Sequence, residues 1–217
     1  MKFDVIKNNQ EINTYIKMAD NYLEGIGYTE HSFNHVLRCV KVVEYILTSL
    51  NYDEKIIELG KIAAYMHDIG NVINRENHAQ SGALMAFRIL DKLGMETTDI
   101  ATIITAIGNH DESSAYPVSV ISAALILADK TDVRRSRVRK GDIKNDIHDR
   151  VNYATIESRV YVDTTCKTIT LKLTIDTTIC SIMEYFEIFL SRMNLCKKAA
   201  NFFDFAFKLS INEQILL

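Results

Sequence analysis

The sequence predicts a mainly helical protein that ends in a small β-β-α-β extension. Its 217 residues include 1 Pro and 8 Gly, where average usage would give about 11 and about 15. So few turn residues disfavour an all-β sandwich or barrel. Apolar residues recur at helical spacing through the first 130 residues, and they alternate strictly later in the chain. With 47% hydrophobic residues, the chain can bury a core as one domain, or as one domain with a small appendage.

Six apolar stripes mark the predicted helices, which cover 12–23, 36–47, 56–66, 83–90, 100–107 and 120–128. Thr29 and Asp53 are expected to cap the second and third helices, since both residue types favour that position. The third helix is expected to end at Gly70, a residue type favoured at C-termini. The last helix has almost no polar face, so we expect it to be buried all round.

The pattern changes after about residue 150. Residues 169–175 alternate between apolar side chains and Thr or Lys, which predicts a half-buried strand. Residues 159–163 are its expected hairpin partner, 183–193 return to helical spacing, and 205–211 alternate again. The predicted domains are therefore a helical one over 1–150 and an extension over 151–217. A charged stretch over 130–150 joins them, and the extension is interpreted as a substrate lid or a dimer surface.

Composition excludes several classes of function. A formal net charge of −3 argues against a general nucleic-acid coat protein. The longest uncharged run, 113–128, contains Pro117 and is too short to span a bilayer. No secretory signal is visible at the N-terminus. The cysteines form no CxxC pair and are expected to be reduced thiols in a cytoplasmic protein.

The residues with the clearest chemistry are histidines and aspartates in the helical part. His67 and Asp68 follow the apolar stretch 62–66, where an imidazole and a carboxylate are costly unless they are paired or bind a metal. Alone, this dipeptide is weak evidence. His35 lies 32 residues earlier, and Asp129 ends the most apolar helix. Such a mixed nitrogen and oxygen set suits Mn, Fe, Co, Ni or Zn rather than a structural cysteine site.

This ordered pattern resembles the HD-domain superfamily of metal-dependent phosphohydrolases. The matching segments are HSFNHVLRCVKVVEYI, AAYMHDIGNVIN and ALILADKTD, within roughly residues 20 to 140. The resemblance implies a helical HD-domain core. It also implies that the first metal is bound by His35, His67, Asp68 and Asp129.

Two further histidines fall in intervals where two-metal members of the superfamily bind a second ion. They are His78 in RENHAQSGALMAF and His110 in AIGNHDESSAYP. The resemblance implies that Asp68 then bridges the two ions. The alternative is a single metal, with both histidines contacting phosphate. Asp111 and the Ala-Tyr-Pro run over 115–117 depart from the HD-GYP phosphodiesterase pattern, which disfavours cyclic di-GMP as substrate.

Two side chains could share a helix face with His35. Arg38 could bind a substrate phosphate bidentately, or it could form an exposed ion pair. His31 is a substrate contact, an extra metal ligand or an ordinary surface histidine.

A basic run follows Asp129, and it comprises Lys130, Arg134, Arg135, Arg137, Arg139 and Lys140. This local excess of positive charge would favour the binding of a phosphate-bearing substrate. Lys130 is the strongest candidate because it adjoins a metal ligand, whereas Arg137, Arg139 and Lys140 are expected to be solvated. Asp132 is expected to orient a ligand or a water.

The leading hypothesis is a cytoplasmic phosphohydrolase with one or two divalent transition metal ions as cofactors. A metal-activated hydroxide would attack a nucleotide-like phosphomonoester or phosphodiester, with Asp68, Lys130 and Arg38 as catalytic residues. The expected partner is this small substrate, without membrane or general nucleic-acid binding, and a homodimer is left open. The alternatives are a di-iron oxygenase of the same superfamily and a non-catalytic nucleotide-binding sensor.

Overall fold

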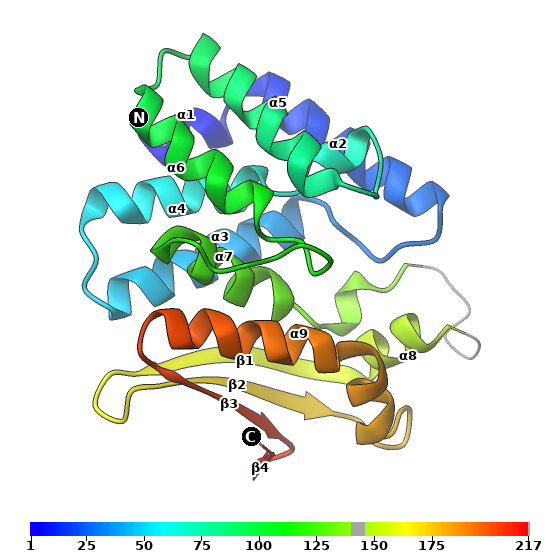
Figure 1. The fold of residues 1–217 in the computed structure, drawn as a ribbon. Coiled ribbons are helices and arrows are strands. Elements are labelled where there is room, and N and C mark those ends of the chain that lie inside the picture. Colours follow the sequence, from blue (N-terminus) through cyan, green and yellow to red (C-terminus); the bar gives the residue numbers. More distant parts are fainter. Residues whose placement is uncertain (140–145, 217) are drawn as a thin grey trace.

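A computed structural model describes residues 1–139 and 146–216, with the helices first and most of the sheet at the end of the chain (Figure 1). The helices of the first part are α1 (Phe3–Lys7), α2 (Gln10–Gly25), α3 (Phe33–Ser49), α4 (Glu54–Met66), α5 (His78–Lys92), α6 (Thr97–Gly108) and α7 (Val120–Lys130). Two 3-10 turns accompany them, η1 (Ile69–Val72) and η2 (Arg135–Arg137). The later elements are α8 (Ile147–Ala154), β1 (Thr155–Asp163), β2 (Thr168–Ile175), α9 (Ile182–Phe202), β3 (Ala206–Ile211) and β4 (Gln214–Ile215).

Helix α7 lies at the centre of the molecule. It packs against α3, α4 and α6 on the helical side and against α9 on the other. Ser119 caps the helix by accepting a hydrogen bond from the backbone N–H of Ser122 at 3.1 Å. Residues 121–128 are all buried, which confirms the prediction of a helix without a solvated face. This central position carries Asp129 into the interior.

The C-terminal sheet has the strand order β1-β2-β3-β4. Strands β1 and β2 form the predicted antiparallel hairpin, with Asp163 opposite Thr168. Strands β2 and β3 are parallel, so α9 is the crossover between them. Figure 1 shows α9 between the sheet and the helical layer. Strand β1 begins at Thr155, four residues earlier than expected, and the short strand β4 was not expected.

Two predicted helix ends are wrong. Helix α3 is capped by Ser32 rather than by Thr29, because the Ser32 hydroxyl accepts from the N–H of Asn34. Helix α4, capped by Asp53 as expected, ends at Met66 rather than at Gly70. Gly70 has another role: a Cβ there would lie 2.0 Å from the backbone oxygen of His78. The glycine therefore lets η1 and the start of α5 pack in direct backbone contact.

The described residues of the predicted charged linker, 130–139 and 146–150, include regular structure. Lys130 ends α7, η2 follows, and α8 begins after Asp146, whose side chain accepts from the N–H groups of His148 and Asp149. The predicted boundary after residue 150 lies inside α8. Lys140 lies outside the described residues. Buried apolar residues from both predicted segments form one cluster.

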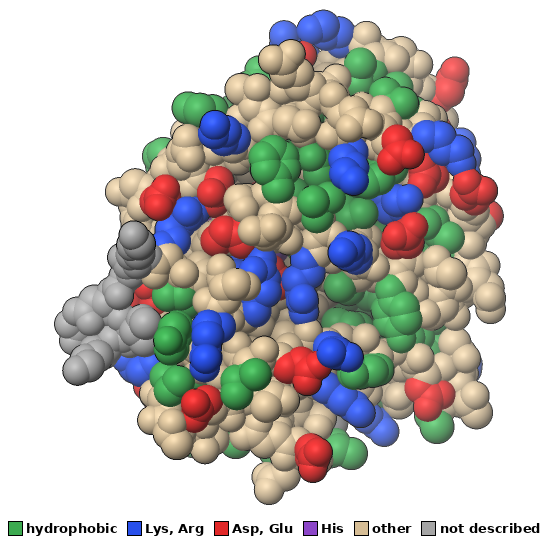
Figure 2. Space-filling view, turned by 180° about the vertical axis from the view of Figure 1, so that it is seen from behind, with side chains coloured by type: hydrophobic (Ala, Val, Ile, Leu, Met, Phe, Trp, Pro, Cys, Tyr) green, Lys and Arg blue, Asp and Glu red, His purple; other side chains and the backbone are tan. Residues whose placement is uncertain are grey.

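No helix in the described part of the chain combines the length and apolarity that crossing a bilayer requires. The face in Figure 2 carries Lys and Arg side chains interspersed with Asp and Glu across its middle. On this face the positive charge is thus broken up by acidic groups.

Candidate metal centre

The six predicted ligand residues come from separate elements and converge on one place. His35 lies in the first turn of α3, and His67 and Asp68 follow the last turn of α4. His78 begins α5, His110 follows α6, and Asp129 lies in the last turn of α7. Asp129 is partly buried and the other five residues are buried. The fold therefore gathers these side chains from a span of almost one hundred residues.

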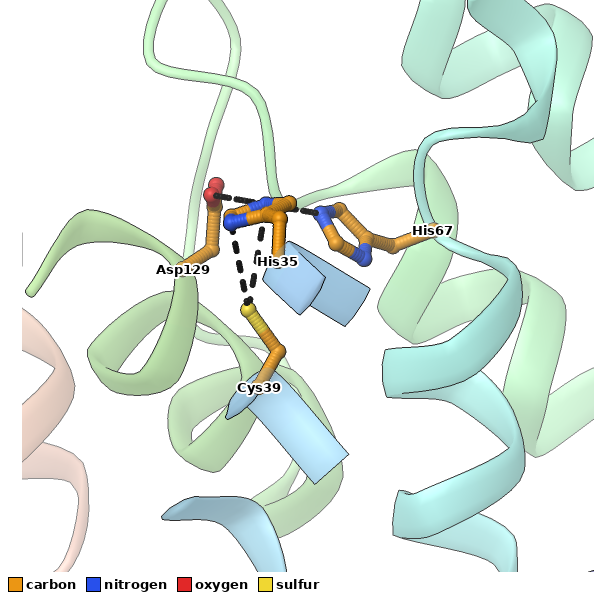
Figure 3. Close-up of side chains that lie close together, drawn as sticks. All are labelled: His35, Cys39, His67 and Asp129. Carbon is orange, nitrogen blue, oxygen red and sulfur yellow. Dashed lines mark hydrogen bonds and ion pairs between the residues drawn. The ribbon is translucent and has the colours of Figure 1, made fainter. Parts of the chain in front are cut away.

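One group of donors surrounds His35 (Figure 3). Its Nε2 lies 3.3 Å from His67 Nε2, 3.6 Å from Asp68 Oδ2 and 3.4 Å from Asp129 Oδ1. The imidazole of His67 belongs to the same group. Its Nε2 atom lies 3.4 Å from Asp68 Oδ2 and 3.9 Å from Asp129 Oδ1. These four side chains present nitrogen and oxygen atoms to a shared point.

A second group lies on the other side of Asp68. Its Oδ1 atom is 3.4 Å from His78 Nε2 and 3.8 Å from His110 Nε2. The two imidazole nitrogens are 3.2 Å apart. Asp68 thus turns one carboxylate oxygen to each group, which is the arrangement expected of a residue that bridges two metal ions.

The other ring nitrogen of each histidine is held by a hydrogen-bond acceptor. The Nδ1 atoms of His67, His78 and His110 contact backbone oxygens three residues earlier, at 2.8, 2.9 and 2.6 Å. A carbonyl can only accept, so each Nδ1 carries a proton. His35 Nδ1 contacts Asp132 Oδ2 at 2.8 Å. All four Nε2 atoms consequently point inward, which is the orientation of metal-ligating histidines.

This arrangement fits a bound cation. A neutral imidazole that is protonated at Nδ1 has an unprotonated Nε2, which can only accept. His78 and His110 would then face each other with two lone pairs at 3.2 Å. Burial lowers the pKa of His110 to about 4, so this ring is neutral at pH 7. A divalent ion between such nitrogens and the Asp68 carboxylate would satisfy all of them at once.

The sulfur of Cys39 lies close to the first group, a contact that the sequence did not suggest. Its Sγ atom is 3.8 Å from His35 Nε2 and 3.9 Å from His35 Nδ1 (Figure 3). Burial raises the pKa of the Cys39 thiol, and a metal binds the thiolate rather than the thiol. The Cys39 sulfur lies within reach of a metal held by His35, His67 and Asp129, but as a buried thiol it is a weaker ligand than the nitrogen and oxygen donors.

The neighbours of the aspartates keep them ionised. Burial by itself would raise the pKa of Asp129. The charge of Lys130 and a hydrogen bond with His35 nevertheless hold this pKa well below its usual range. Lys130 Nζ lies 2.7 Å from Asp129 Oδ2. Burial also acts on Asp132, whose pKa is nevertheless strongly lowered by its bond with His35 and by nearby arginines. Asp132 orients His35, in line with its predicted role.

A cavity of about 350 Å³ opens beside the donors. Asp68, His78 and Asp129 reach its wall. Four cationic side chains also line it, and they are Arg75, Lys130, Arg137 and Arg192. The arrangement therefore offers metal ligands and positive charge to one small molecule.

The structure places other predicted contacts differently. His31 lines the cavity, and burial lowers its pKa. Arg137 was expected to be solvated, but it is 4% exposed and binds the backbone oxygens of Glu30 and Asp132. Arg139 was also expected to be solvated, but it pairs with Asp20. The guanidinium groups of Arg137 and Arg139 thus form hydrogen bonds and ion pairs with the protein, whereas in a solvated linker they would be bound by water.

Arg38 lies behind the metal donors rather than among the residues that line the cavity. Its Nε atom is 2.9 Å from Asp132 Oδ1, and its Nη2 group donates to the backbone oxygen of Ser158. The guanidinium thus joins helix α3 to strand β1.

Besides Cys39, sequence reasoning missed further residues near the site, among them Arg75, Asp111, His148 and Arg192. Arg75 Nη1 lies 3.3 Å from His78 Nε2, and Asp111 Oδ1 lies 3.9 Å from the same nitrogen. His148 and Arg192 line the cavity from α8 and α9. The position of Asp111 beside His110 was the one available signal, since the other three belong to no motif.

Known proteins resemble this chain in part of its length. An uncharacterized protein from Methanocaldococcus jannaschii is 26% identical over 184 residues, which are 72% of this chain and 69% of that protein. A solved structure of a predicted HD superfamily hydrolase from an uncultured Thermotogales bacterium is 24% identical. The match covers 58% of this chain and 68% of that one, with a TM-score of 0.46. Residues 32–138, which contain all six donors, match the model of the HD domain. Residues 32–138 of this chain are thus identified as an HD domain.

Proposed function

We propose that this protein is a metal-dependent phosphohydrolase that acts on a small phosphomonoester or phosphodiester. One observation carries the proposal. Two groups of nitrogen and oxygen donors share Asp68 and lie at the wall of a cavity that Lys and Arg side chains line. The shared carboxylate supports a pair of ions. The Lys and Arg side chains at the wall, which also carries Asp146 and Asp149, support an anionic substrate.

The two donor groups would hold two ions. His35, His67, Asp68 and Asp129 would bind the first, and Asp68, His78 and His110 would bind the second. Divalent ions at these positions supply a water of lowered pKa as nucleophile, together with Lewis-acid stabilisation of phosphoryl charge.

The chain's own cations would act on the same phosphoryl group. The side chain of Lys130 is only 7% exposed, and it lines the cavity beside Asp129. Arg75 lies beside the second donor group, with its guanidinium over the ring of Tyr28 at 5.4 Å. Both groups are fixed before substrate arrives, so they can stabilise negative charge as it develops in the transition state. Arg38 is not part of this set, since its guanidinium is bound to Asp132 and Ser158.

The test combines elemental analysis with an activity panel. Protein purified without added metal is assayed against phosphomonoesters, phosphodiesters and nucleotides, and the Asp68→Ala variant is assayed beside it. We expect turnover that chelator abolishes and that Asp68→Ala lacks. Asp91 is exposed on α5, so Asp91→Ala is the matched control and should keep full activity. Turnover by Asp68→Ala at the wild-type rate would contradict the proposal.

The convergence of all six donors also favours a second candidate, a di-iron oxygenase of the same superfamily. Such an enzyme needs the full set of His35, His67, Asp68, His78, His110 and Asp129, and these residues lie together here. Two irons per chain and oxygen-dependent turnover would support this candidate. A colourless protein with Mn or Zn, active without oxygen, would count against it.

A further inference from the structure

A chain of contacts leads from the C-terminal sheet to the first donor group. Ser158, in strand β1, is 4% exposed. Its hydroxyl donates to the backbone oxygen of Thr131 at 2.6 Å, and its carbonyl accepts from Arg38 Nη2. The strand is therefore bound both to helix α3 and to the segment that follows α7.

The same guanidinium reaches the carboxylate that orients a metal donor. Arg38 Nε lies 2.9 Å from Asp132 Oδ1, while Asp132 Oδ2 lies 2.8 Å from His35 Nδ1. Arg134 Nε also contacts Asp132 Oδ1 at 2.9 Å. Because the Asp132 side chain is fully buried, its two oxygens can be held in place only by such direct contacts.

We infer that Arg38 and Ser158 are positioning residues that, through Asp132, fix the ring of His35 for metal binding. We call Arg38, Asp132 and Ser158 the Asp132 clamp. In this arrangement strand β1 is part of the scaffold of the metal centre, although it lies outside the residues that match the HD domain. The inference rests on metal binding and not on the proposed hydrolysis.

A purely structural role would be to attach α3 to β1, and the protein contains a control for it. Tyr45, on the same helix, accepts a hydrogen bond at its hydroxyl from the N–H of Val162, on the same strand, at 3.1 Å. Tyr45→Phe removes a contact between the same two elements without touching Asp132. Arg38→Gln removes a contact that also reaches the metal donors.

The experiment measures Co²⁺ binding to the full chain by competition titration and by visible absorption of the bound ion. Removing residues that orient a metal-bound histidine weakens binding by about 10- to 100-fold, so we expect this loss for Asp132→Asn. Because Arg134 also holds Asp132, Arg38→Gln should lose about tenfold and shift the absorption bands. Arg38→Lys keeps the charge but not the planar fork, so it should restore part of the affinity. Tyr45→Phe should match the wild type in affinity and spectrum.

Two results would overturn the inference. One is wild-type Co²⁺ affinity and spectrum in Arg38→Gln, and the other is equal losses in Arg38→Gln and Tyr45→Phe. Thermal melts of the metal-free variants confirm that each is folded. If Arg38→Gln does not fold, Ser158→Ala decides, because it removes the bond to Thr131 and should shift the Co²⁺ spectrum in the same direction. These readouts need no turnover, so they stand apart from any failure of the phosphohydrolase proposal.

Discussion

Three of the donor histidines are anchored in one way, by a backbone oxygen three residues earlier. For His67 and His110 this oxygen belongs to the last turn of α4 or α6. The last carbonyls of a helix have no partner within the helix. Helix ends thus supply acceptors that fix these rings with Nε2 directed inward.

Lys130 is the residue whose replacement best separates metal binding from charge stabilisation. Lys130→Met removes the ammonium beside Asp129 but none of the donors, so metal content should stay at the wild-type level. Loss of a preorganised charge-stabilising group costs about 10²-fold or more in rate, and we expect a fall of this size in kcat/KM for the phosphate ester. Lys172→Met is the control, since Lys172 lies over the ring of Tyr161 on the sheet. An unchanged kcat/KM in Lys130→Met would exclude this role.

Glu30 gives a prediction about pH. Burial by itself would raise the pKa of Glu30. A hydrogen bond from Ser32 and the charge of Arg134 outweigh this effect of burial and hold the pKa below its ordinary value of 4.5. The ionised carboxylate therefore stabilises the fold above pH 4.5, and this contribution is lost as the pH falls through the lowered pKa. Glu30→Gln should cost roughly 1–3 kcal/mol at pH 7. Urea unfolding should show a smaller difference at pH 3, and an equal difference at both pH values would refute the assignment.

At the residue scale, the sequence predicted six candidate donors, which the structure brings together, but it did not predict their surroundings. The donors could be found because His35, His67–Asp68 and Asp129 follow a recognisable order on helices. Arg75 and Arg192 stand in no pattern, and they border the same cavity only because the fold brings α9 and the residues before α5 to it. The partner of Arg38 could not be predicted, because Ser158 lies 120 residues away in the sequence.

At the element scale, the contact between η1 and α5 sets the distance between the two donor groups. A Cβ on Gly70 would lie 2.0 Å from the backbone oxygen of His78 and 2.4 Å from the nitrogen of Gly82. Gly70→Ala must push α5 away, which should destabilise the protein by about 3 kcal/mol or more and weaken binding of the second ion. Gly25→Ala is the matched control, because a Cβ there meets nothing within 4 Å. Thermal unfolding and metal titration check both variants, and equal stability of the two would contradict this packing.

The elements themselves were largely predictable, and their ends were not. Apolar stripes at helical spacing and strict alternation both report burial of one face, so they located the long helices and the hairpin. Ends depend on single capping contacts, such as the bond from Asn34 to Ser32 that starts α3. Helix α8 was missed because its eight residues are too few to show a clear apolar stripe, and its start depends on the side chain of Asp146.

For the whole molecule, the helical part and the extension share one buried cluster. Tyr185 and Phe189 of α9 are at most 1% exposed, and α9 packs on α7. A chain that ends at residue 154 would expose the apolar face of α7, so we expect it to aggregate or to lose its helical circular dichroism signal. Cooperative unfolding of that fragment, with wild-type metal binding, would show instead that the predicted 1–150 segment folds independently.

The central claim for the molecule is that Asp68 joins two metal positions, and elemental analysis of Asp68→Asn tests it most directly. The amide keeps the size of the side chain but loses the charge that two ions would share. We expect about two divalent ions per wild-type chain, and loss of bound metal and of metal-dependent phosphate ester hydrolysis in Asp68→Asn. Wild-type metal content and turnover in Asp68→Asn would contradict it.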